Sequence, residues 1–497
     1  MTDSQQIMQS AMEVLQSGDV KSAIELFEQA LAMTPADFDA LHILGVLEHR
    51  QGHCERAESL IRQALEVNPQ FPEAHYNLGR VLDDLNRGDE AIASYRIALS
   101  LNSNMDAAWF NLGLAHERRQ NLNEAAEAYR NAIRVNAEDA DYHFNLGNIY
   151  FVQKDPVLAI ESYDAALNLN PSYYMALNNR GIAYRELGNL ERAIDSYQKA
   201  IGLRPDFGDA YFNLGNAYEA AGNLQWAGEA YETAIDYRPD MTKAHNNLGN
   251  VYYSLGQWDK ALSEYETAVT LDPDSESAQH MLHSLKGENA NKAPDRYVAT
   301  LFDKAATDFE DRLVNDLKYD SPRELREELS KLVSADKRFA NALDLGCGTG
   351  LSGAAFRSIA DRLTGVDLSS RMVALAKAKG IYQELAVGEI LDYLQGTEES
   401  FDLFLAADVL AYLGDLSALF EAVRRRALPS AYFLFTLEGV EGQDYVLRKT
   451  GRFAHSRPYI ERLAMQLQFH IEVCAETVIR TENDKPITGM NLILKCL

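Results

Sequence analysis

The feature that most constrains the fold of this 497-residue chain is a glycine that recurs every 34 residues through its first half. Two alanine series keep the same spacing, and an apolar or aromatic residue lies between them, which is tyrosine in the six copies from Tyr95 to Tyr265. A fixed period of this length predicts stacked copies of one small unit rather than a single closed core. The glycines are Gly45, Gly79, Gly113, Gly147, Gly181, Gly215 and Gly249.

The residue types within each period are those of packed helix pairs. Glycine and alanine let two helices approach closely, and we expect the tyrosine to fill the space between neighbouring repeats. Proline closes most copies, where it stops the second helix. The stretch "AHYNLGRVLDDLNRGDEAIASYRIALSLN" resembles the tetratricopeptide repeat (TPR) family, and about eight copies are present. The resemblance implies an all-α right-handed superhelix over residues 1–286, with a partner-binding concave groove and "SESAQHMLHSLKG" as its capping helix.

An asparagine stands immediately before the leucine-glycine pair in six of these repeats, at a position that faces the groove in related repeat families. An asparagine ladder can exchange hydrogen bonds with an extended peptide backbone. The alternative is that these side chains bridge neighbouring repeats. Acidic residues at nearby inner positions, with only Lys243 basic, favour a basic or neutral peptide over an acidic one. The asparagines are Asn77, Asn111, Asn145, Asn179, Asn213 and Asn247, and the acids are Asp39, Glu73, Asp141 and Asp209.

The charge of the chain is uneven. Residues 1–290 contain 43 acidic and 21 basic side chains, whereas the rest contains 31 and 26. An acidic half of this kind repels nucleic acid and anionic lipid. No apolar run reaches membrane-spanning length, and "MTDSQQIMQS" does not have the pattern of a secretory signal. The four cysteines are widely separated, which suits a reducing compartment, so we expect the protein in the cytoplasm. The cysteines form no cluster of metal-binding spacing with histidines or acids, and we expect no metal.

A second domain follows a change in pattern. "GENANKAP", residues 287–294, is polar, breaks the period and predicts a linker. Residues 295–338 read as helices with one apolar face, and beyond them strand-like runs alternate with helical patterns as in a parallel sheet. The last 29 residues read as two strands joined by a turn at Asn483 to Pro486, which predicts a closing antiparallel hairpin and a mixed sheet.

A glycine-rich turn, "ALDLGCGTGLSG", opens this second domain. A dinucleotide site calls for glycine at the sixth position of the turn, where this chain has Leu351, and Asp344 would repel a pyrophosphate. An acid before the turn suits a ligand with an ammonium group, and Asp367 at the end of the next strand suits ribose hydroxyls. A nicotinamide dehydrogenase is therefore disfavoured.

Three ordered motifs carry a second resemblance. "LDLGCGTG", "LTGVDLSSRMVALAKAKG" and "FDLFLAADVLAYLGDL" are similar to those of class I S-adenosylmethionine-dependent methyltransferases. The order of repeats, "APDRYVATLFDKAATDFEDRL" and this core also resembles a bacterial group of TPR-containing methyltransferases. The resemblance implies a Rossmann-like α/β domain over residues 295–497 with a mixed seven-stranded sheet, and residues 295–338 as lid helices.

The same resemblance implies roles for individual residues. The glycines let the backbone approach the cofactor, Asp344 orients its ammonium, Asp367 accepts its ribose hydroxyls, and the remaining residues pack around the adenine or border the methyl donor. Phe302 and Tyr319 are expected to cover cofactor and substrate. The cofactor set is Asp344, Gly346, Cys347, Gly348, Gly350, Asp367, Leu368, Met372, Glu389, Ile390, Asp408 and Phe302.

The acceptor side of the site is less specified by the sequence. Asp408, Tyr412, Glu438 and His455 are candidates for a base, which is needed only when the acceptor is protonated. Arg452, His455 and Tyr459 together form a candidate site for an anionic acceptor. The leading hypothesis is an active methyltransferase that acts on a small molecule, glycan or protein at oxygen, nitrogen or carbon. The alternative is a TPR adaptor with a regulatory or inactive cofactor-binding module.

Overall fold

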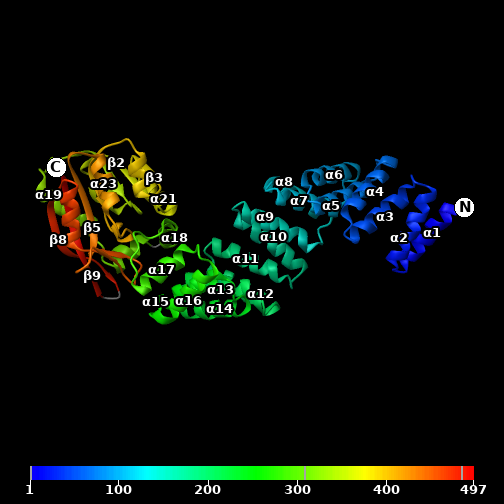
Figure 1. Cartoon of the computed structure of the whole chain (residues 1–497), viewed down its shortest axis with the longest axis horizontal. Coiled ribbons are helices and arrows are strands. Elements are labelled where there is room, and N and C mark those ends of the chain that lie inside the picture. The colour runs from blue at the N-terminus through cyan, green and yellow to red at the C-terminus, as the bar shows by residue number, and fades with distance from the viewer. Residues whose placement is uncertain (1–2, 307–308, 483–484) are drawn as a thin grey trace. The chain divides into compact units, whose positions relative to one another are not determined.

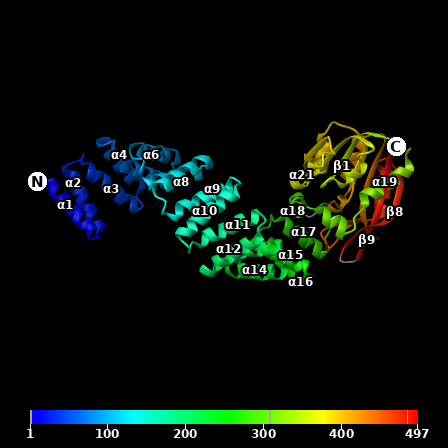
Figure 2. The ribbon, with the colours of Figure 1, turned by 180° about the vertical axis from the view of Figure 1, so that it is seen from behind.

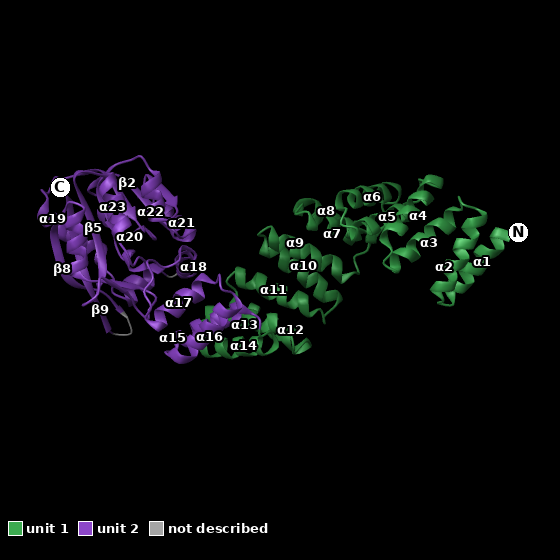
Figure 3. Ribbon diagram, in the orientation of Figure 1, with its two compact units in different colours: residues 1–239 green, residues 240–497 purple. Residues whose placement is uncertain are grey.

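The computed structural model describes residues 3–306, 309–482 and 485–497. The chain divides into two compact units, Met1–Pro239 and Asp240–Leu497 (Figure 3). The division falls inside the repeat region, so that the last repeat belongs to the same compact unit as the α/β domain. The expected linker at residues 287–294 lies wholly within the second unit.

The described part of the first unit is a succession of seven helix pairs (Figure 1). Each pair is an antiparallel hairpin whose two members differ in length by at most one residue. The helices are α1 (Asp3–Gln16), α2 (Val20–Met33), α3 (Phe38–Arg50), α4 (Cys54–Val67), α5 (Pro72–Asp84), α6 (Gly88–Leu101), α7 (Asp106–Arg118), α8 (Leu122–Val135), α9 (Ala140–Val152), α10 (Pro156–Leu169), α11 (Tyr174–Glu186), α12 (Leu190–Leu203), α13 (Gly208–Ala220) and α14 (Leu224–Tyr237).

The recurring glycine is required by the tyrosine of its own repeat. A Cβ added at Gly215 in α13 would lie 2.5 Å from Cε1 of Tyr231 in α14, and every other glycine of the series meets its partner at a similarly short distance. Tyr231 is fully buried. We expected the tyrosine to lie between neighbouring repeats, and the structure shows that it also packs within its own repeat, against the first helix.

The second unit begins with the last repeat and its cap. Helices α15 (Thr242–Ser254) and α16 (Trp258–Leu271) form the eighth pair, with Gly249 against Tyr265, and α17 (Glu276–Lys286) follows them. The described residues up to 286 therefore contain eight pairs and a final helix, as the period predicts. Gly287 ends α17 in a left-handed conformation with φ of 69°, which glycine adopts without strain.

A mixed sheet forms the centre of the α/β domain. Its main path runs β3-β2-β1-β4-β5, with all neighbours parallel, and β9 lies antiparallel to β5 with β8 outside it. The strands are β1 (Phe339–Leu345), β2 (Ala360–Asp367), β3 (Glu384–Val387), β4 (Phe401–Ala406), β5 (Ala427–Gly439), β6 (Tyr445–Leu447), β7 (Phe453–His455), β8 (Phe469–Glu482) and β9 (Lys485–Cys496).

The sheet differs from the expected one in strand number. The seven strands of the predicted mixed sheet are present, and the described residues contain two more, β6 and β7, which form a small antiparallel hairpin with β7 parallel to β5. Strands this short carry no alternating pattern that a sequence could reveal. The closing hairpin of β8 and β9 is confirmed, although residues 483 and 484 of the predicted turn lie outside the described residues.

Helices pack on both faces of this sheet, over two buried apolar clusters. Figures 1 and 2 show α19 beside β8 in both views. Segment 295–338, predicted to be helical, contains α18, η1 and α19. The helices are α18 (Asp295–Ala305), η1 (Asp311–Asp316, a π-helix), α19 (Ser321–Leu332), α20 (Leu351–Phe356), α21 (Ser370–Ala378), α22 (Ile390–Gly396), η2 (Leu410–Tyr412, a 3₁₀ turn), α23 (Ser417–Arg426) and α24 (Arg457–Gln466).

Candidate functional site

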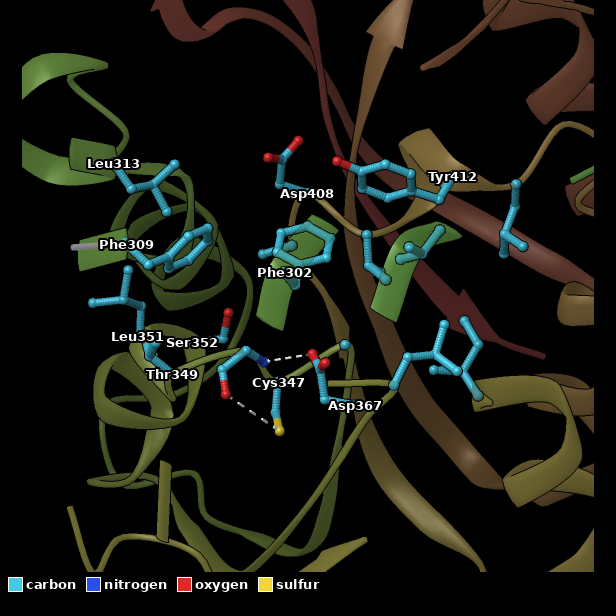
Figure 4. A pocket seen from close by; sticks show the side chains of 18 of the residues that line it. Phe302, Phe309, Leu313, Cys347, Thr349, Leu351, Ser352, Asp367, Asp408 and Tyr412 are labelled. Carbon is cyan, nitrogen blue, oxygen red and sulfur yellow. Dashed lines mark hydrogen bonds between the residues drawn. The ribbon is translucent and has the colours of Figure 1, made fainter. Parts of the chain in front are cut away.

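A pocket lies at the carboxyl ends of β1, β2 and β4, which is where open α/β sheets bind ligands. Figure 4 shows Asp367 at one end of it, Asp408 and Tyr412 at the other, and Phe302 between them. The segments before and within the lid contribute Ala293, Asp295, Val298, Phe302, Phe309, Leu313 and Tyr319. The pocket is thus built from the sheet edge on one side and the lid helices on the other.

The three glycines of the turn have different reasons to be glycine. All three have positive φ, which L side chains rarely adopt. A Cβ at Gly346 would lie 2.4 Å from Val409, and one at Gly350 would lie 3.1 Å from Tyr382, whereas a Cβ at Gly348 would meet nothing within 4 Å. Gly348 lines the pocket and Gly350 does not. Only Gly348 therefore leaves its side-chain space open toward the pocket.

Asp367 is tied to the glycine turn by its carboxylate. Its Oδ2 accepts a 2.8 Å hydrogen bond from the Gly348 N–H (Figure 4). Its Oδ1 accepts one of 2.8 Å from the Ser369 N–H. Burial raises the pKa of Asp367, while these backbone bonds act in the opposite direction. The carboxylate thus caps the turn and still has lone pairs at the pocket wall for hydroxyl donors.

Asp344 is fully buried beneath the turn, with an unpaired oxygen. Tyr382 donates a 2.6 Å hydrogen bond to Asp344 Oδ2, whereas Oδ1 has no partner within the described ranges. Burial raises the pKa of Asp344 to about 7, partly offset by Tyr382. Asp344 itself does not line the pocket, although Gly346, two residues later, does. A buried orphan acceptor is the kind of group that a cationic or donor-bearing ligand satisfies, directly or through water.

The predicted adenine side is only partly assembled at the pocket wall. Leu368, Glu389 and Ile390 line the pocket, and Met372 is buried behind it. Glu389 caps α22, because its Oε2 accepts hydrogen bonds of 2.6 Å from Leu391 N–H and 2.8 Å from Asp392 N–H. Its capping role fixes the start of α22 and thereby holds Ile390 in the pocket wall.

The opposite end of the pocket is aromatic and polar. Phe302 packs edge-on against Tyr412, with ring centres 5.5 Å apart, and against Phe309 at 5.8 Å. Tyr319 and Tyr412 are both more than nine-tenths buried, and burial raises the pKa of each phenol. Asp408 has φ of 57°, a left-handed conformation that is costly for a residue other than glycine and that often marks a functional position.

Asp408 is held by a buried charge cluster behind the pocket. Arg452 donates hydrogen bonds to Asp408, to Glu438 Oε1 at 2.7 Å and to Tyr412 Oη at 2.9 Å. Arg480 donates a 2.8 Å bond to Glu438 and lies 3.5 Å from Asp408. Burial acts to raise the pKa of Glu438, but these two guanidinium groups hold it below its usual value. Arg448 is also ion-paired with Glu438, at 3.1 Å, so three guanidinium groups surround these two carboxylates.

The prediction that Arg452, His455 and Tyr459 form a site for an anionic acceptor is wrong. None of the three lines the pocket. His455 is fully buried and its Nε2–H donates to the Gly414 carbonyl, and burial lowers its pKa to about 4, so it is a neutral structural imidazole. Tyr459 donates to Asp415 and accepts from the Leu416 N–H, while Arg452 is neutralised by carboxylates. Ser456 caps the following helix as expected.

The asparagine series bonds mainly across repeats. The side-chain amide of Asn111 donates to Tyr76 of the preceding repeat at 3.0 Å, and three others make equivalent bonds, whereas Asn145 donates to a carbonyl of its own helix. The amide nitrogens of these four asparagines therefore bridge neighbouring repeats, which is the alternative stated in the sequence analysis. Asn247 lies in α15 of the second unit. The other cross-repeat pairs are Asn77–His42, Asn179–Asn148 and Asn213–Asn178.

One group of metal-binding side chains lies together among the described residues, which the sequence spacing did not reveal. The donor atoms of His49, Cys54 and Asp84 are within 4.8 Å of one another. His49 Nε2 and Asp84 Oδ2 are 2.6 Å apart, and the corresponding pair one repeat later, Asp83 and Arg118, is an ion pair at 3.3 Å. The His49–Asp84 contact is thus a polar contact between neighbouring repeats, at the place that an ion pair occupies one repeat later.

Three residues near the site were missed by sequence reasoning. Tyr382 supports both Asp344 and the glycine turn, Arg480 reaches the charge cluster from β8, and Ala293 lines the pocket from the expected linker. A polar "GENANKAP" and a tyrosine in a loop carry no signal of these contacts. Arg480 had one weak signal, a charge within an apolar strand pattern.

The family models that match this chain fall into two groups, one over the repeats and one over the α/β domain. A family model described as a methyltransferase domain matches residues 343–435. Models described as tetratricopeptide or TPR repeats match the region before it, at residues 14–74, 50–111, 81–133, 110–174, 162–195, 183–222 and 212–276. The chain therefore carries TPR repeats followed by a region that matches a methyltransferase domain.

Curated relatives that are named as O-methyltransferases match about a fifth of this chain. The ubiquinone biosynthesis O-methyltransferase of Xanthomonas oryzae pv. oryzae is 29% identical over 133 residues, which is 23% of this chain and 54% of that protein. The same-named protein of Hydrogenovibrio crunogenus is 24% identical over 109 residues, which is 21% of this chain and 45% of that protein. The chain spans about half the length of the curated relatives it matches.

Solved structures match the repeat region. YrrB, described as a TPR protein with an unusual peptide-binding site, is 27% identical, with a TM-score of 0.34 over 37% of this chain and 95% of that one. MamA is 26% identical, with a TM-score of 0.32 over 33% of this chain and 97% of that one. Among the helices of the described residues, none is both long and apolar enough to cross a membrane.

Proposed function

We propose that this chain transfers a methyl group from S-adenosylmethionine to an acceptor held beside Asp408, and that its repeats bind a protein or peptide partner. The observation that carries the proposal is the glycine turn bonded to Asp367, with the open space at Gly348 and the unpaired oxygen of Asp344 beside it. These groups suit a ligand that bears an ammonium and a ribose. When bound, this cofactor supplies an electrophilic methyl group.

The residues of the chain then act mainly by positioning. Asp367 accepts hydrogen bonds from ribose hydroxyls, Asp344 accepts from the ammonium, and Ile390 and Leu368 cover the adenine. Phe302 and Tyr319 exclude water from the pocket, which prevents competing reactions and strengthens polar contacts.

Asp408 is our candidate for the residue that faces the acceptor. Its carboxylate, fixed by Arg452, accepts a hydrogen bond from the acceptor's O–H or N–H and takes up the proton when the acceptor is protonated. Tyr412 lies at the same end of the pocket with its hydroxyl oriented by Arg452. The relatives named O-methyltransferase favour oxygen as the methylated atom. We do not carry His455 forward as a catalytic candidate.

The repeats are proposed to recruit the substrate or a partner. The cross-repeat bonds use the amide N–H groups of four asparagines, and the side-chain oxygens of Asn77, Asn111 and Asn213 accept no hydrogen bond within the described ranges. Acceptor oxygens together with acids such as Asp39 and Glu73 favour a basic extended segment. Binding of a lysine-rich peptide that weakens with salt supports this, and preference for a glutamate-rich peptide contradicts it.

The experiment that tests the enzyme has two stages. Calorimetric titration with S-adenosylmethionine measures binding, and labelled methyl transfer into a cell extract measures turnover. A labelled protein band identifies a protein acceptor, and label in small molecules or glycans identifies the other classes. Binding without transfer into any fraction would favour the alternative of an adaptor with an inactive cofactor module. Absence of binding would refute the proposal.

We propose a cytoplasmic location, since all four cysteines are unpaired in the structure.

A further inference from the structure

The loop between β6 and β7 is bonded on one side to the helix that caps the repeats. Ser284 of α17 donates a 2.7 Å hydrogen bond from its hydroxyl to the Arg448 carbonyl and accepts one of 3.2 Å from the Gly451 N–H. His280 of α17 donates from Nε2 to the Gly451 carbonyl at 2.9 Å. His280 and Ser284 are both buried, at 3% and 0% exposure. These bonds join segments about 165 residues apart in the chain.

Close approach at this point depends on Gly451. The residue has φ of 72°, and a Cβ added there would lie 3.1 Å from the Tyr297 hydroxyl and 3.4 Å from Met281 Sδ. Burial lowers the pKa of His280, which favours the neutral ring whose Nε2–H donates to the carbonyl. The contact between α17 and the loop is therefore both tight and hydrogen-bonded, unlike a loose contact between domains.

The other side of the same loop holds the acceptor end of the pocket. Arg452, next to Gly451, bonds Asp408, Tyr412 and Glu438. Arg448, whose carbonyl accepts from Ser284, is ion-paired with Glu438 at 3.1 Å. One peptide unit thus separates the contact with α17 from the guanidinium that orients Asp408 and Tyr412.

The expected linker adds a parallel set of bonds. Asn289 accepts from the Leu447 N–H at 2.8 Å and donates to the Tyr445 carbonyl at 3.2 Å. Ala293 N–H donates to the Tyr412 carbonyl at 2.8 Å. The segment after α17 is thereby fixed along β6 and η2, so α17 has no free linker through which it could move independently of the pocket.

We propose that His280 and Ser284 are positioning residues of the transferase, which fix the loop at residues 448–452 so that Arg452 holds Asp408 and Tyr412 in place. The capping helix of the repeats is accordingly a structural part of the acceptor end of the pocket. The inference rests on the proposed function. It goes beyond it because it assigns a role in the reaction to residues of the repeat region.

The test compares Ser284→Ala and His280→Phe with His283→Phe in the full chain. His283 is a matched control because it lies on the same helix with a side chain that is 44% exposed. Hydrogen exchange across residues 448–452 should speed up by about 2- to 12-fold in the first two variants, since one intramolecular hydrogen bond contributes roughly 0.5–1.5 kcal/mol. The rate of methyl transfer at saturating cofactor should fall, while cofactor affinity should stay as in the wild type.

Each outcome decides the matter. Faster exchange with a lower transfer rate in both variants, and neither change in His283→Phe, supports the proposal. Unchanged exchange, or faster exchange with a wild-type transfer rate, overturns it. His280→Phe removes the Nε2–H donor and keeps a ring beside Tyr297, and it serves as the second variant where Ser284→Ala does not fold. A wild type that does not bind the cofactor refutes the proposed function separately, because the exchange measurement needs no activity.

Discussion

The buried carboxyl of Asp344 makes cofactor binding depend on pH in a way that can be calculated. Burial raises its pKa to about 7, so at pH 5.5 most of the free protein carries a proton there. The ammonium of S-adenosylmethionine favours the carboxylate. Binding is therefore expected to expel this proton to solvent, and the affinity should rise with pH until the carboxyl is ionised in the free protein.

The size of the effect follows from the pKa. With a value of about 7, the affinity should rise about 16-fold between pH 5.5 and 7.0, and binding at pH 6 should release about 0.9 proton. The range ends at pH 7 because a free α-amino group begins to lose its own proton near pH 7.7. Asp344→Asn keeps the shape of the side chain and removes the titration, so both the rise and the released proton should disappear.

Calorimetric titration in two buffers of different ionisation enthalpy measures the released proton directly. Tyr382→Phe is a useful companion, because it removes the 2.6 Å hydrogen bond to Asp344 that acts to lower the pKa. The affinity profile of that variant should move to higher pH. A wild type that binds with no proton release at pH 6 and with a flat profile would refute the reasoning, as would an Asp344→Asn variant that keeps both effects.

The same shift has a consequence for stability with the opposite dependence on pH. The carboxyl loses its proton near pH 3.8 in the unfolded chain and at about 7 in the folded one. Its contribution to stability is therefore fully present below pH 3.8 and is lost as the pH rises through 7. In urea denaturation, wild type should lose stability relative to Asp344→Asn between pH 5 and 7. A constant difference between the two proteins would contradict the assignment.

Asp367→Asn is expected to weaken cofactor binding about 10- to 150-fold in calorimetry, because a hydrogen bond to a charged group contributes roughly 1.5–3 kcal/mol; unchanged affinity would exclude the ribose role. Asp408→Asn should lower methyl transfer by about 10²- to 10⁴-fold when the acceptor needs a base, with cofactor affinity within about twofold of wild type; weakened cofactor binding would instead place Asp408 at the cofactor. In the repeats, Gly215→Ala puts a Cβ 2.5 Å from Tyr231 and should destabilise by about 1–3 kcal/mol in urea denaturation. Gly202→Ala, a helical position with nothing within 4 Å, should be neutral or stabilising by up to about 1 kcal/mol; equal effects of the two changes would contradict the packing argument.

Much of the architecture could be predicted because its signals are local and periodic. The 34-residue spacing of Gly215 and its counterparts gives the helix pairs, since each glycine meets a large side chain 16 residues later in the same hairpin, which is Ile61 for Gly45 and a tyrosine for the other six. The glycine turn and Asp367 are likewise near one another in the chain, 19 residues apart at Gly348, and the structure joins them by a direct hydrogen bond. Features that arise within one hairpin or one β-α-β unit can be read from the sequence.

The acceptor end of the pocket was decided by tertiary structure. Arg452, Asp408 and Arg480 come from three segments whose approach depends on the register of β5, β8 and the short β6–β7 hairpin. The sequence pattern placed Arg452 and His455 in one candidate anion site, whereas the fold pairs Arg452 with two carboxylates and buries His455 as a neutral imidazole.

The sequence by itself therefore determined the class of protein: the repeat array, the glycine turn and the acid that follows it on the next strand. Only the tertiary structure decided which side chains reach the pocket and which are satisfied elsewhere. The physical reason is that repeat packing and the strand-turn-helix unit depend on contacts between residues close in the chain, whereas a buried charge cluster depends on elements that meet only when the whole unit is folded. The segment at residues 287–294 shows the difference, because its polar composition is that of a linker and its backbone is bonded to the wall of the pocket.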